Sequence, residues 1–494
     1  MIDSKLLRSC ETEKLHLSGA IQSFGALLWL DEQLCVAHAS ANLAAFVGAS
    51  PQQMLGQSVV DCCSWLPQTM LERLGPKAGD TLANALSVEG KSLFITLTRG
   101  ERCIVLEIEY DVPLAEPMAL HHSNYQRPLL TVPRDAAAMT MHHQALLDAF
   151  RNITGYDRIM LYQFREDWAG EVIAEVAAAD IGSYLGLRFP ASDIPAIARN
   201  LYLLNPARLI PDATAAAVPL LALENAPPPD LTYSTLRSVA AVHLQYLGNM
   251  GMRASFSVPI RITGRLWGLV ACHHLLQPKW ISPTQRQACI DTASAYALGV
   301  ASFISSQRLQ SMDSLERRTD NLLRYLANCK DPLDGIATSG DQFRDMLAAD
   351  GFALAIGDQV TITGNAPDLD GMGIIDNWFL SRDTEWVAST DHLESLFPDQ
   401  TMLLAAASGM LAVKARSQHS GWVRFYWFRQ QEPEQVAWAG NPNKPVTENA
   451  GAVALSPRRS FERWVETKTG YSRPWSNEER MTAAKFRNTL IRWL

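Results

Sequence analysis

The stretch that decides how this chain is interpreted is Arg188-Phe189-Pro190-Ala191-Ser192-Asp193-Ile194-Pro195. Its two prolines fix the backbone φ angle and prevent a regular hydrogen-bond ladder. Between them a stiff turn presents one carboxylate, Asp193, among apolar neighbours. Such a turn suits a ligand with N–H donors. The plainer alternative is a rigid surface loop whose aspartate caps a following helix at 196–204.

The composition is that of a globular, core-forming chain. The 494 residues suggest about three domains at roughly 150 residues each, and 47% of the residues are hydrophobic. The net charge of −8 argues against nucleic-acid binding, which needs clustered lysine and arginine. We expect no signal peptide and no membrane span, because apolar runs stop short of the ~18 residues that a span needs. Eight scattered cysteines without a CxxC pair are typical of a cytoplasmic protein.

The pattern predicts an α+β fold of three consecutive antiparallel-sheet domains joined by a long helical spine. The first domain, 1–112, combines short helices with strands at 20–36, 93–98 and 103–110. The second, 130–305, has a helix ending at Gly155, a long proline-containing loop, and strands at 158–164, 170–177, 253–260 and 266–273. The third, 320–494, has a Trp-rich strand at 422–428. It ends in an open helical pattern at 483–494, which we interpret as either a cut or a junction to a further segment.

From Thr284 a helical pattern continues without proline as far as Pro332. Its apolar stripe comprises Ile290, Ala293, Ala297, Val300, Ile304, Leu309, Met312 and Leu315. About forty residues at 1.5 Å each span roughly 60 Å, which exceeds the core of one domain. We therefore expect this helix to be a dimer interface or a rigid spine between domains.

Alternation along two strands of the middle domain assigns side chains to faces. On 253–260, two hydroxyls, Ser255 and Ser257, share a face and need hydrogen-bond partners. On 266–274, one face is expected to carry Trp267, Leu269, Ala271 and His273. His274 then points to the opposite side, so the adjacent histidines cannot chelate one metal. Taken alone, His273 and His243 are typical of satisfied core histidines.

Catalytic motifs are not found. A thiol enzyme would use Cys272, but its apolar strand predicts a buried, unactivated thiol. The sequence has no P-loop, GxSxG, HExxH or kinase signature. The pairs His121-His122 and His142-His143 are expected to be solvated, and no metal site is predicted.

Several long motifs together resemble the bacteriophytochromes. Cys10-Glu11 and residues 15–22 resemble that family's N-terminal chromophore-attachment segment. Motifs of its GAF domain are matched, in order and at similar spacing, by residues 158–164, 188–195, 243–251 and 266–274. Its PHY domain is matched by residues 456–461 and 470–475. The resemblance covers nearly the whole chain as PAS (1–112), GAF (130–305) and PHY (320–494), with a hairpin "tongue" at about 420–475.

The resemblance implies a red/far-red photoreceptor rather than an enzyme, with biliverdin IXα bound as a thioether to Cys10. The backbone carbonyl of Asp193 would face the pyrrole N–H groups, with His243 nearby through a water, and His273 would bond the D-ring carbonyl. The pocket would be lined by Tyr162, Phe189, Ile194, Pro195, Tyr202 and Tyr246. The two propionates would be held by Arg208, Arg237, Ser255 and Ser257.

The resemblance also implies a light switch. Isomerisation at the D ring would move the pairing of Asp193 from Arg458 to Ser460, while the tongue refolds from strand to helix and Trp427 and Trp475 exchange places. The signal would pass along the spine of a homodimer to an output domain or a response regulator. The chain departs from the family pattern at Ser23-Phe24, Ala240, Gln430 and Ala439-Gly440. The alternative is a bilin-free GAF-type sensor of a small ligand such as a cyclic nucleotide.

Overall fold

The computed structural model describes residues 14–112, 126–400, 406–417, 421–442 and 461–491. The chain divides into two compact units. The first comprises Met1–Phe303 with Ala437–Trp464, and the second comprises Ile304–Val436 with Val465–Leu494. Three sheets carry the fold, which confirms the predicted α+β class.

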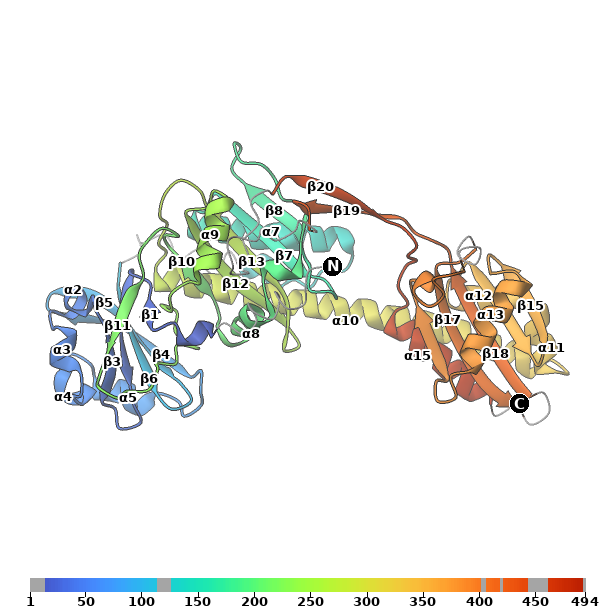
Figure 1. Ribbon diagram of the computed structural model, residues 1–494, viewed down its shortest axis with the longest axis horizontal. Coiled ribbons are helices and arrows are strands. Elements are labelled where there is room, and N and C mark those ends of the chain that lie inside the picture. The colour runs from blue at the N-terminus through green and yellow to red at the C-terminus, as the bar shows by residue number, and fades with distance from the viewer. Residues whose placement is uncertain (1–13, 113–125, 401–405, 418–420, 443–460, 492–494) are drawn as a thin grey trace. The chain divides into compact units, whose positions relative to one another are not determined.

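The first sheet has the strand order β1-β11-β3-β2-β6-β5-β4 (Figure 1). Its strands from the N-terminal part of the chain are β1 (Ala20–Ile21), β2 (Gly25–Leu30), β3 (Val36–Ser40), β4 (Thr81–Val88), β5 (Lys91–Arg99) and β6 (Ile104–Tyr110). One face is packed by the short helices α2 (Leu43–Val47), α3 (Pro51–Met54), α4 (Val59–Cys62) and α5 (Gln68–Arg73). The 3₁₀ turn η1 (Leu15–Leu17) precedes β1.

Strand β11 (Val218–Ala222) joins this sheet from far along the chain. It pairs antiparallel with β1 and β3, although its residues were expected to form a loop. The segment that carries it leaves the second sheet and returns to it, so the first two sheets are tied together by the backbone. The expectation of one strand–turn–strand over 20–36 is also wrong at its start, because β1 and β2 are separate strands with different partners.

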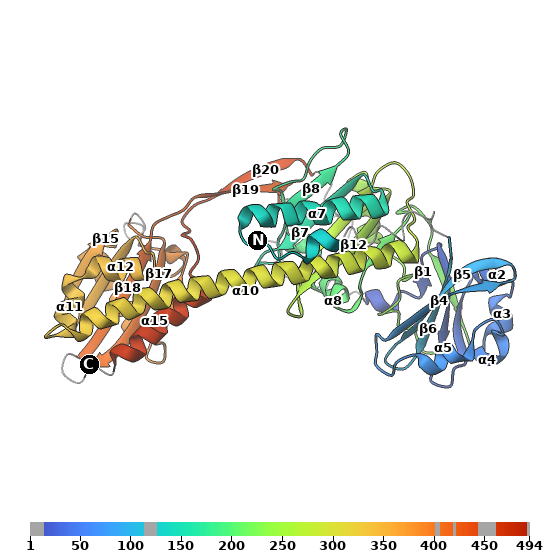
Figure 2. The same ribbon diagram turned by 180° about the vertical axis from the view of Figure 1, so that it is seen from behind.

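The second sheet has the order β10-β12-β13-β7-β8-β9-β19-β20. Its strands are β7 (Arg158–Phe164), β8 (Gly170–Ala177), β9 (Arg188–Phe189), β10 (Arg208–Ile210), β12 (Ala254–Ile262), β13 (Arg265–His274), β19 (Glu434–Ala439) and β20 (Arg463–Lys468). One face packs on α7 (Ala136–Thr154) and the first part of α10 (Pro283–Ala327), as Figure 2 shows. The other face is turned toward α8 (Ala196–Leu204) and α9 (Ala241–Asn249). The 3₁₀ turns are η2 (Arg127–Leu130) and η3 (Ala191–Asp193).

The predicted face of Trp267 is wrong. Val270 and Cys272 lie in the core beneath α7 and α10, and Leu269 and Ala271 pack on the opposite face. Trp267 contacts the helix-side core with Val270. The cause is a bulge in β13, because Gly268 pairs with Ile260 and Leu266 with Arg261, which leaves Trp267 as the extra residue between the two pairs. The alternation of side chains reverses at such a residue.

The expectation that His142 is solvated is also wrong. His142 is buried and stacks on Tyr296 of α10, with ring centroids 5.0 Å apart. The hydroxyl of Tyr296 lies 2.9 Å from Nδ1 of His143, and burial lowers the pKa of His143 to about 4. The sequence pattern predicts the helix that carries His142. It gives no signal for the neighbouring helix that covers this face of it.

The second unit is built on the sheet β15-β14-β18-β17-β16. Its strands are β14 (Gly351–Ile356), β15 (Gln359–Gly364), β16 (Val387–Thr390), β17 (Gly409–Ser417) and β18 (Gly421–Arg429). Helix α13 (Leu369–Leu380) packs on one face. The other face packs on the last part of α10 with α12 (Gly340–Met346) and α15 (Asn477–Leu490) (Figure 2). The remaining elements are α11 (Pro332–Thr338) and the turn η4 (Leu393–Ser395).

Helix α10 is 45 residues long, as the stripe predicted. Several apolar side chains of the helix are exposed, among them Leu298 at 71% and Leu309 at 63%. Among the described residues it is also a stretch long and apolar enough to cross a membrane, contrary to expectation, but 44% of that window is buried in the protein. A core helix of a globular protein passes the same test.

Candidate functional site

The Pro190–Pro195 turn adopts the stiff conformation that its prolines predict. Both prolines have extended backbones, and the amide of Asp193 donates to the carbonyl of Pro190 at 3.0 Å. Asp193 does not cap α8, whose cap residue is Pro195 without a side-chain hydrogen bond. Instead its carboxylate accepts a hydrogen bond from the hydroxyl of Tyr246 at 2.9 Å. The turn is therefore tied to α9 rather than to the helix that follows it.

Arg199 holds the turn from the side of α8. Its guanidinium donates to the carbonyl of Ile194 at 2.6 Å and to that of Ala191 at 3.4 Å. The same guanidinium lies over the ring of Trp168, 4.6 Å from its centroid. Sequence reasoning missed this residue because its function depends on a stacking partner in a distant hairpin turn.

An aromatic wall stands next to the turn. Tyr162 and Phe189 are buried, with ring centroids 5.9 Å apart, and Tyr202 packs against the same cluster. Gly170 makes room for this wall, because a Cβ there would lie 1.6 Å from the Cζ of Tyr162. Tyr246 stacks on His243, at 6.1 Å between centroids.

The two predicted histidines are neutral at physiological pH. Burial lowers the pKa of His273 to about 3, and the charges of Arg158 and His243 act in the same direction. Burial lowers the pKa of His243 to about 4, helped by Arg208. The ring of His243 is nevertheless accessible to solvent.

Two arginines converge on the next part of the site. Burial lowers the pKa of Arg208 to about 9 and that of Arg237 to about 10. Their guanidiniums donate hydrogen bonds to backbone carbonyls, Arg208 to that of Arg237 at 2.6 Å and Arg237 to that of Leu231 at 3.1 Å. Within the described residues neither arginine forms an ion pair with a carboxylate. The site therefore has two cations without bound counter-charges.

The hydroxyl pair lies beside these cations. Ser255 and Ser257 are buried on β12, and β10 pairs with them at Ile210 and Arg208. The hydroxyl of Tyr202 lies 2.7 Å from Oγ of Ser257. The predicted sharing of one face by the two serines is consistent with this pairing, since Phe256 packs in the opposite core.

These residues fit a bilin, a ligand with carboxylates and hydrogen-bonding groups along an apolar body. Nδ1 of His273 is buried without a hydrogen-bond partner in the described part of the chain. The unpaired guanidiniums of Arg208 and Arg237 suit two carboxylates, and the aromatic wall suits a flat conjugated body. Helix α8 has no fully buried side chain, as expected of a helix that covers a ligand site.

Part of the prediction falls outside the described residues. Cys10, Arg458 and Ser460 belong there. Phe461, the next residue, is described, and its ring meets that of Tyr246 edge-on at 5.3 Å. Strand β19 pairs in parallel with β9, Trp438 opposite Arg188. The hairpin segment thus reaches both the stretch 188–195 and the Asp193–Tyr246 pair.

The predicted exchange of Trp427 and Trp475 stays a prediction, and the structure places both side chains in one core cluster. Both are buried in the core of the second unit. Trp427 donates from its indole to the carbonyl of Phe343 at 2.7 Å, and Arg429 stacks on Trp475 at 3.6 Å. These contacts are those of core residues. Trp438 is the tryptophan that pairs with Arg188 in the stretch 188–195. The motif Trp438-Ala439-Gly440 was the signal that could have identified it.

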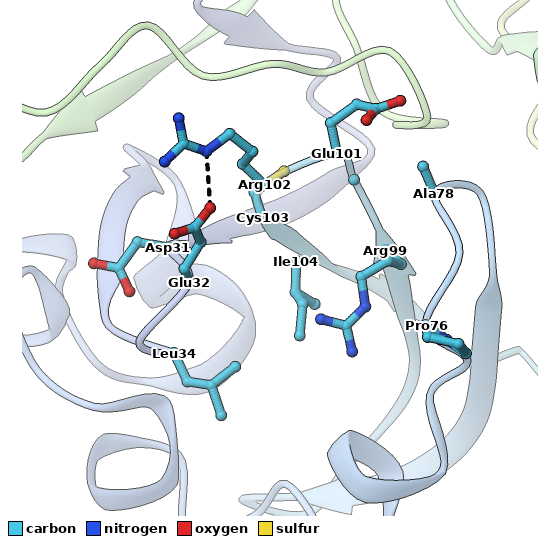
Figure 3. A pocket seen from close by; sticks show the side chains of 11 residues that line it. Asp31, Glu32, Leu34, Pro76, Ala78, Arg99, Glu101, Arg102, Cys103 and Ile104 are labelled. Carbon is cyan, nitrogen blue, oxygen red and sulfur yellow. Dashed lines mark hydrogen bonds and ion pairs between the residues drawn. The ribbon is translucent and has the colours of Figure 1, made fainter.

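Two other features carry no chemistry. Cys272 is fully buried and desolvation raises its pKa far above the usual range, which leaves no activated thiol. A hollow at the edge of the first sheet is lined by polar residues, including the exposed Arg102–Glu32 pair (Figure 3). None of its lining residues belongs to the site around Asp193.

Comparisons with known proteins match all three parts of the chain. Family models match as a PAS fold over residues 10–111, a GAF domain over 144–301 and a phytochrome region over 315–494. A bacteriophytochrome of Pseudomonas aeruginosa is 35% identical, and cyanobacterial phytochrome B of Nostoc sp. is 32% identical, each over 98% of this chain. The chain spans 66% of the length of each of these curated relatives.

Two solved structures are similar over nearly their whole length. The bacteriophytochrome RpBphP3 from R. palustris has 30% identity and a TM-score of 0.81, covering 98% of this chain and 99% of that one. The phytochrome photosensory core module of Stigmatella aurantiaca has 32% identity and a TM-score of 0.81, covering 98% and 97%.

Proposed function

The chain belongs to the phytochrome family as a PAS-GAF-PHY photosensory core module, and from this premise we propose that it senses red and far-red light with biliverdin IXα bound to Cys10. The family implies a bilin of some kind; the name of the Pseudomonas relative favours biliverdin. The observation that carries the proposal is the convergence of the half-buried Arg208 and the buried Arg237, neither of which forms an ion pair with a carboxylate in the described residues. Two such cations beside an aromatic wall suit a dianion with an apolar body.

The residues of the site hold and orient the pigment. Arg208, Arg237 and the two serines bind the propionates. Neutral His273 can accept or donate one hydrogen bond at the far end of the site, and the 190–195 turn presents carbonyls to N–H donors. When bound, the bilin supplies the absorption of red light and the isomerisation at its D ring. Desolvation by the protein keeps both histidines uncharged, so a positive charge in the site belongs to the ligand and the arginines.

The signal leaves the site through the hairpin of β19 and β20, whose strand β19 pairs with β9 in the stretch 188–195. A change at Asp193 alters its bond with Tyr246, and Tyr246 contacts Phe461. The partners Arg458 and Ser460 remain as proposed, with strand-to-helix refolding of the tongue. Trp427 and Trp475 exchange places in that refolding, and Trp438, which pairs with Arg188, joins them in this scheme. The longer relatives suggest an output domain or response regulator as the recipient, in a cytoplasmic homodimer.

The proposal is tested by adding biliverdin to the purified, bilin-free chain. A red absorption band should appear, and alternating red and far-red light should shift it reversibly. A chain that stays colourless would favour the bilin-free small-ligand sensor, in which the same arginines would bind another dianion such as a nucleotide phosphate.

Attachment is tested separately with Cys10→Ser. We expect this variant to bind the pigment non-covalently and to lose the zinc-induced fluorescence of the denatured band. The matched control is Cys35→Ser, which should retain the fluorescence. The reverse outcome would move the linkage from Cys10 to Cys35.

A further inference from the structure

Strand β6 of the PAS sheet carries two buried carboxylates, Glu107 and Glu109, which are 1% and 2% exposed. They lie two residues apart and therefore on one face of the strand. A buried carboxylate is stable only when charges or donors surround it. Glu109 forms an ion pair with Arg286 at the start of α10, at 2.6 Å. Glu107 has no such cation and takes its partners from a different part of the chain.

The partners of Glu107 are three consecutive residues that lead to Arg237. Ser234 donates from its hydroxyl at 2.6 Å, Thr235 from its hydroxyl at 2.7 Å, and Leu236 from its amide at 2.9 Å. The hydroxyl oxygen of Ser234 also accepts the amide of Arg237 at 3.1 Å. The carboxylate of Glu107 thus fixes the backbone segment that carries Arg237, one of the arginines proposed to bind a propionate.

The same short segment also positions Arg208. The guanidinium of Arg208 donates to the backbone carbonyls of Thr235 at 3.3 Å, Arg237 at 2.6 Å and Ser238 at 3.0 Å. Residues 231–238 form no helix, and only an isolated bridge from Ile21 to Arg237 pairs with them. Backbone hydrogen bonds tie Leu231 to His16, Leu236 to Gln22 and Ser238 to Ala20. Between these points, the buried carboxylate of Glu107 adds three bonds to residues 234–236.

Packing presses this segment onto the PAS sheet. Leu236 is fully buried, and a Cβ placed on Gly25 would lie 2.7 Å from its Cδ1. The charge of Glu107 also opposes the desolvation that lowers the pKa of Arg237 and of Arg208. It does so without an ion pair, so the guanidinium N–H groups that do not bond to backbone carbonyls remain available for a ligand.

We propose that Glu107 is a positioning residue through which the PAS domain aims Arg208 and Arg237 at the bilin carboxylates. The inference rests on the proposed function, because it assigns those arginines to the propionates. It predicts that a GAF domain without β6 lacks a correctly shaped anion site.

The test compares Glu107→Ala with the matched control Glu109→Ala, which removes an equally buried carboxylate from the same strand. Each variant and the wild type are titrated with biliverdin and with biliverdin dimethyl ester, whose propionates are masked. We expect E107A to bind biliverdin about tenfold more weakly than the wild type and to bind the ester within twofold of the wild type. E109A should match the wild type for both pigments.

Hydrogen–deuterium exchange in the bilin-free protein gives a second measurement. Residues 231–238 should exchange faster in E107A and remain protected in E109A. If E107A does not fold, Thr235→Val removes one of the three bonds and should weaken biliverdin binding at least twofold, with no effect on the ester.

Two results would overturn the inference: unchanged biliverdin binding by a folded E107A, or an equal loss for biliverdin and its ester. Failure of the proposed function gives a different result, since the wild type itself would then bind neither pigment while the exchange difference persisted.

Discussion

At the scale of single residues, Arg199 is the group that holds the 190–195 turn. A hydrogen bond from a charged donor contributes about 1.5–3 kcal/mol, and the ring of Trp168 keeps the guanidinium flat above the turn. We expect Arg199→Met to make the amides of residues 191–194 exchange ~30-fold faster, equivalent to about 2 kcal/mol. Arg199→Lys should recover only part of the protection, because an ammonium lacks the planar fork.

The control for this prediction is Arg265→Met, which removes an exposed arginine of β13. Surface changes of this kind usually stay within about 0.5 kcal/mol. Equal exchange at residues 191–194 in the wild type and in Arg199→Met would show that the prolines alone hold the turn.

His273 should make the bilin-free protein sensitive to acid. Its pKa in the folded protein is about 3, below the ordinary value of about 6.5. Between these values the unfolded chain binds one more proton, so stability falls as the pH falls below 6.5. The contribution from pH 7 to pH 5 is about 2 kcal/mol. His273→Gln should reduce the loss of unfolding free energy across this range by that amount, measured by urea denaturation. An unchanged pH slope would contradict the burial of His273 as a neutral group.

At the scale of elements, the hairpin of β7 and β8 depends on a close approach at Gly170. A methyl group there would overlap the ring of Tyr162, and overpacking of this kind costs about 1–3 kcal/mol. We expect Gly170→Ala to lower the melting temperature of the bilin-free protein and to shift the absorption maximum of the loaded protein. Gly182→Ala is the matched control, since its added Cβ would meet no atom within 4 Å. Similar spectra for the two variants would mean that Tyr162 does not touch the pigment.

The elements also show how far the sequence alone could lead. Strands with clear alternation, such as β7 and β12, were predicted because period-two patterns are local. Strand β11 was missed because its five residues have no local alternation pattern, and they form a strand only by pairing with β3 and β1. The bulge at Trp267 becomes visible only in the pairing of β13 with β12, where Trp267 is the extra residue. Among site residues, Asp193 was found through its prolines, whereas Arg199 and Glu107 were missed because their partners are distant in sequence.

The whole chain shows the same limit in the placement of tryptophans. The family resemblance assigns Trp427 to the switch, which stays a prediction, and the structure places Trp427 on a core strand of the second unit. A Trp in a strand has no sequence signal that separates a buried core position from a docking position. Only the pairing of Trp438 with Arg188 makes that distinction.

Self-association is the property that we expect α10 to give to the whole molecule. Exposed leucines on a long helix indicate a partner helix, and Leu298 and Leu309 are among the most exposed apolar residues described. We expect the chain to sediment as a dimer and the double variant Leu298→Glu/Leu309→Glu to sediment as a monomer, because two buried carboxylates would face their own copies across the interface. Leu276→Glu is the control, since Leu276 is 90% exposed outside this helix, and should remain dimeric. A dimer that survives the double variant would place the interface on another surface, and the spine would then serve only to join domains of one chain.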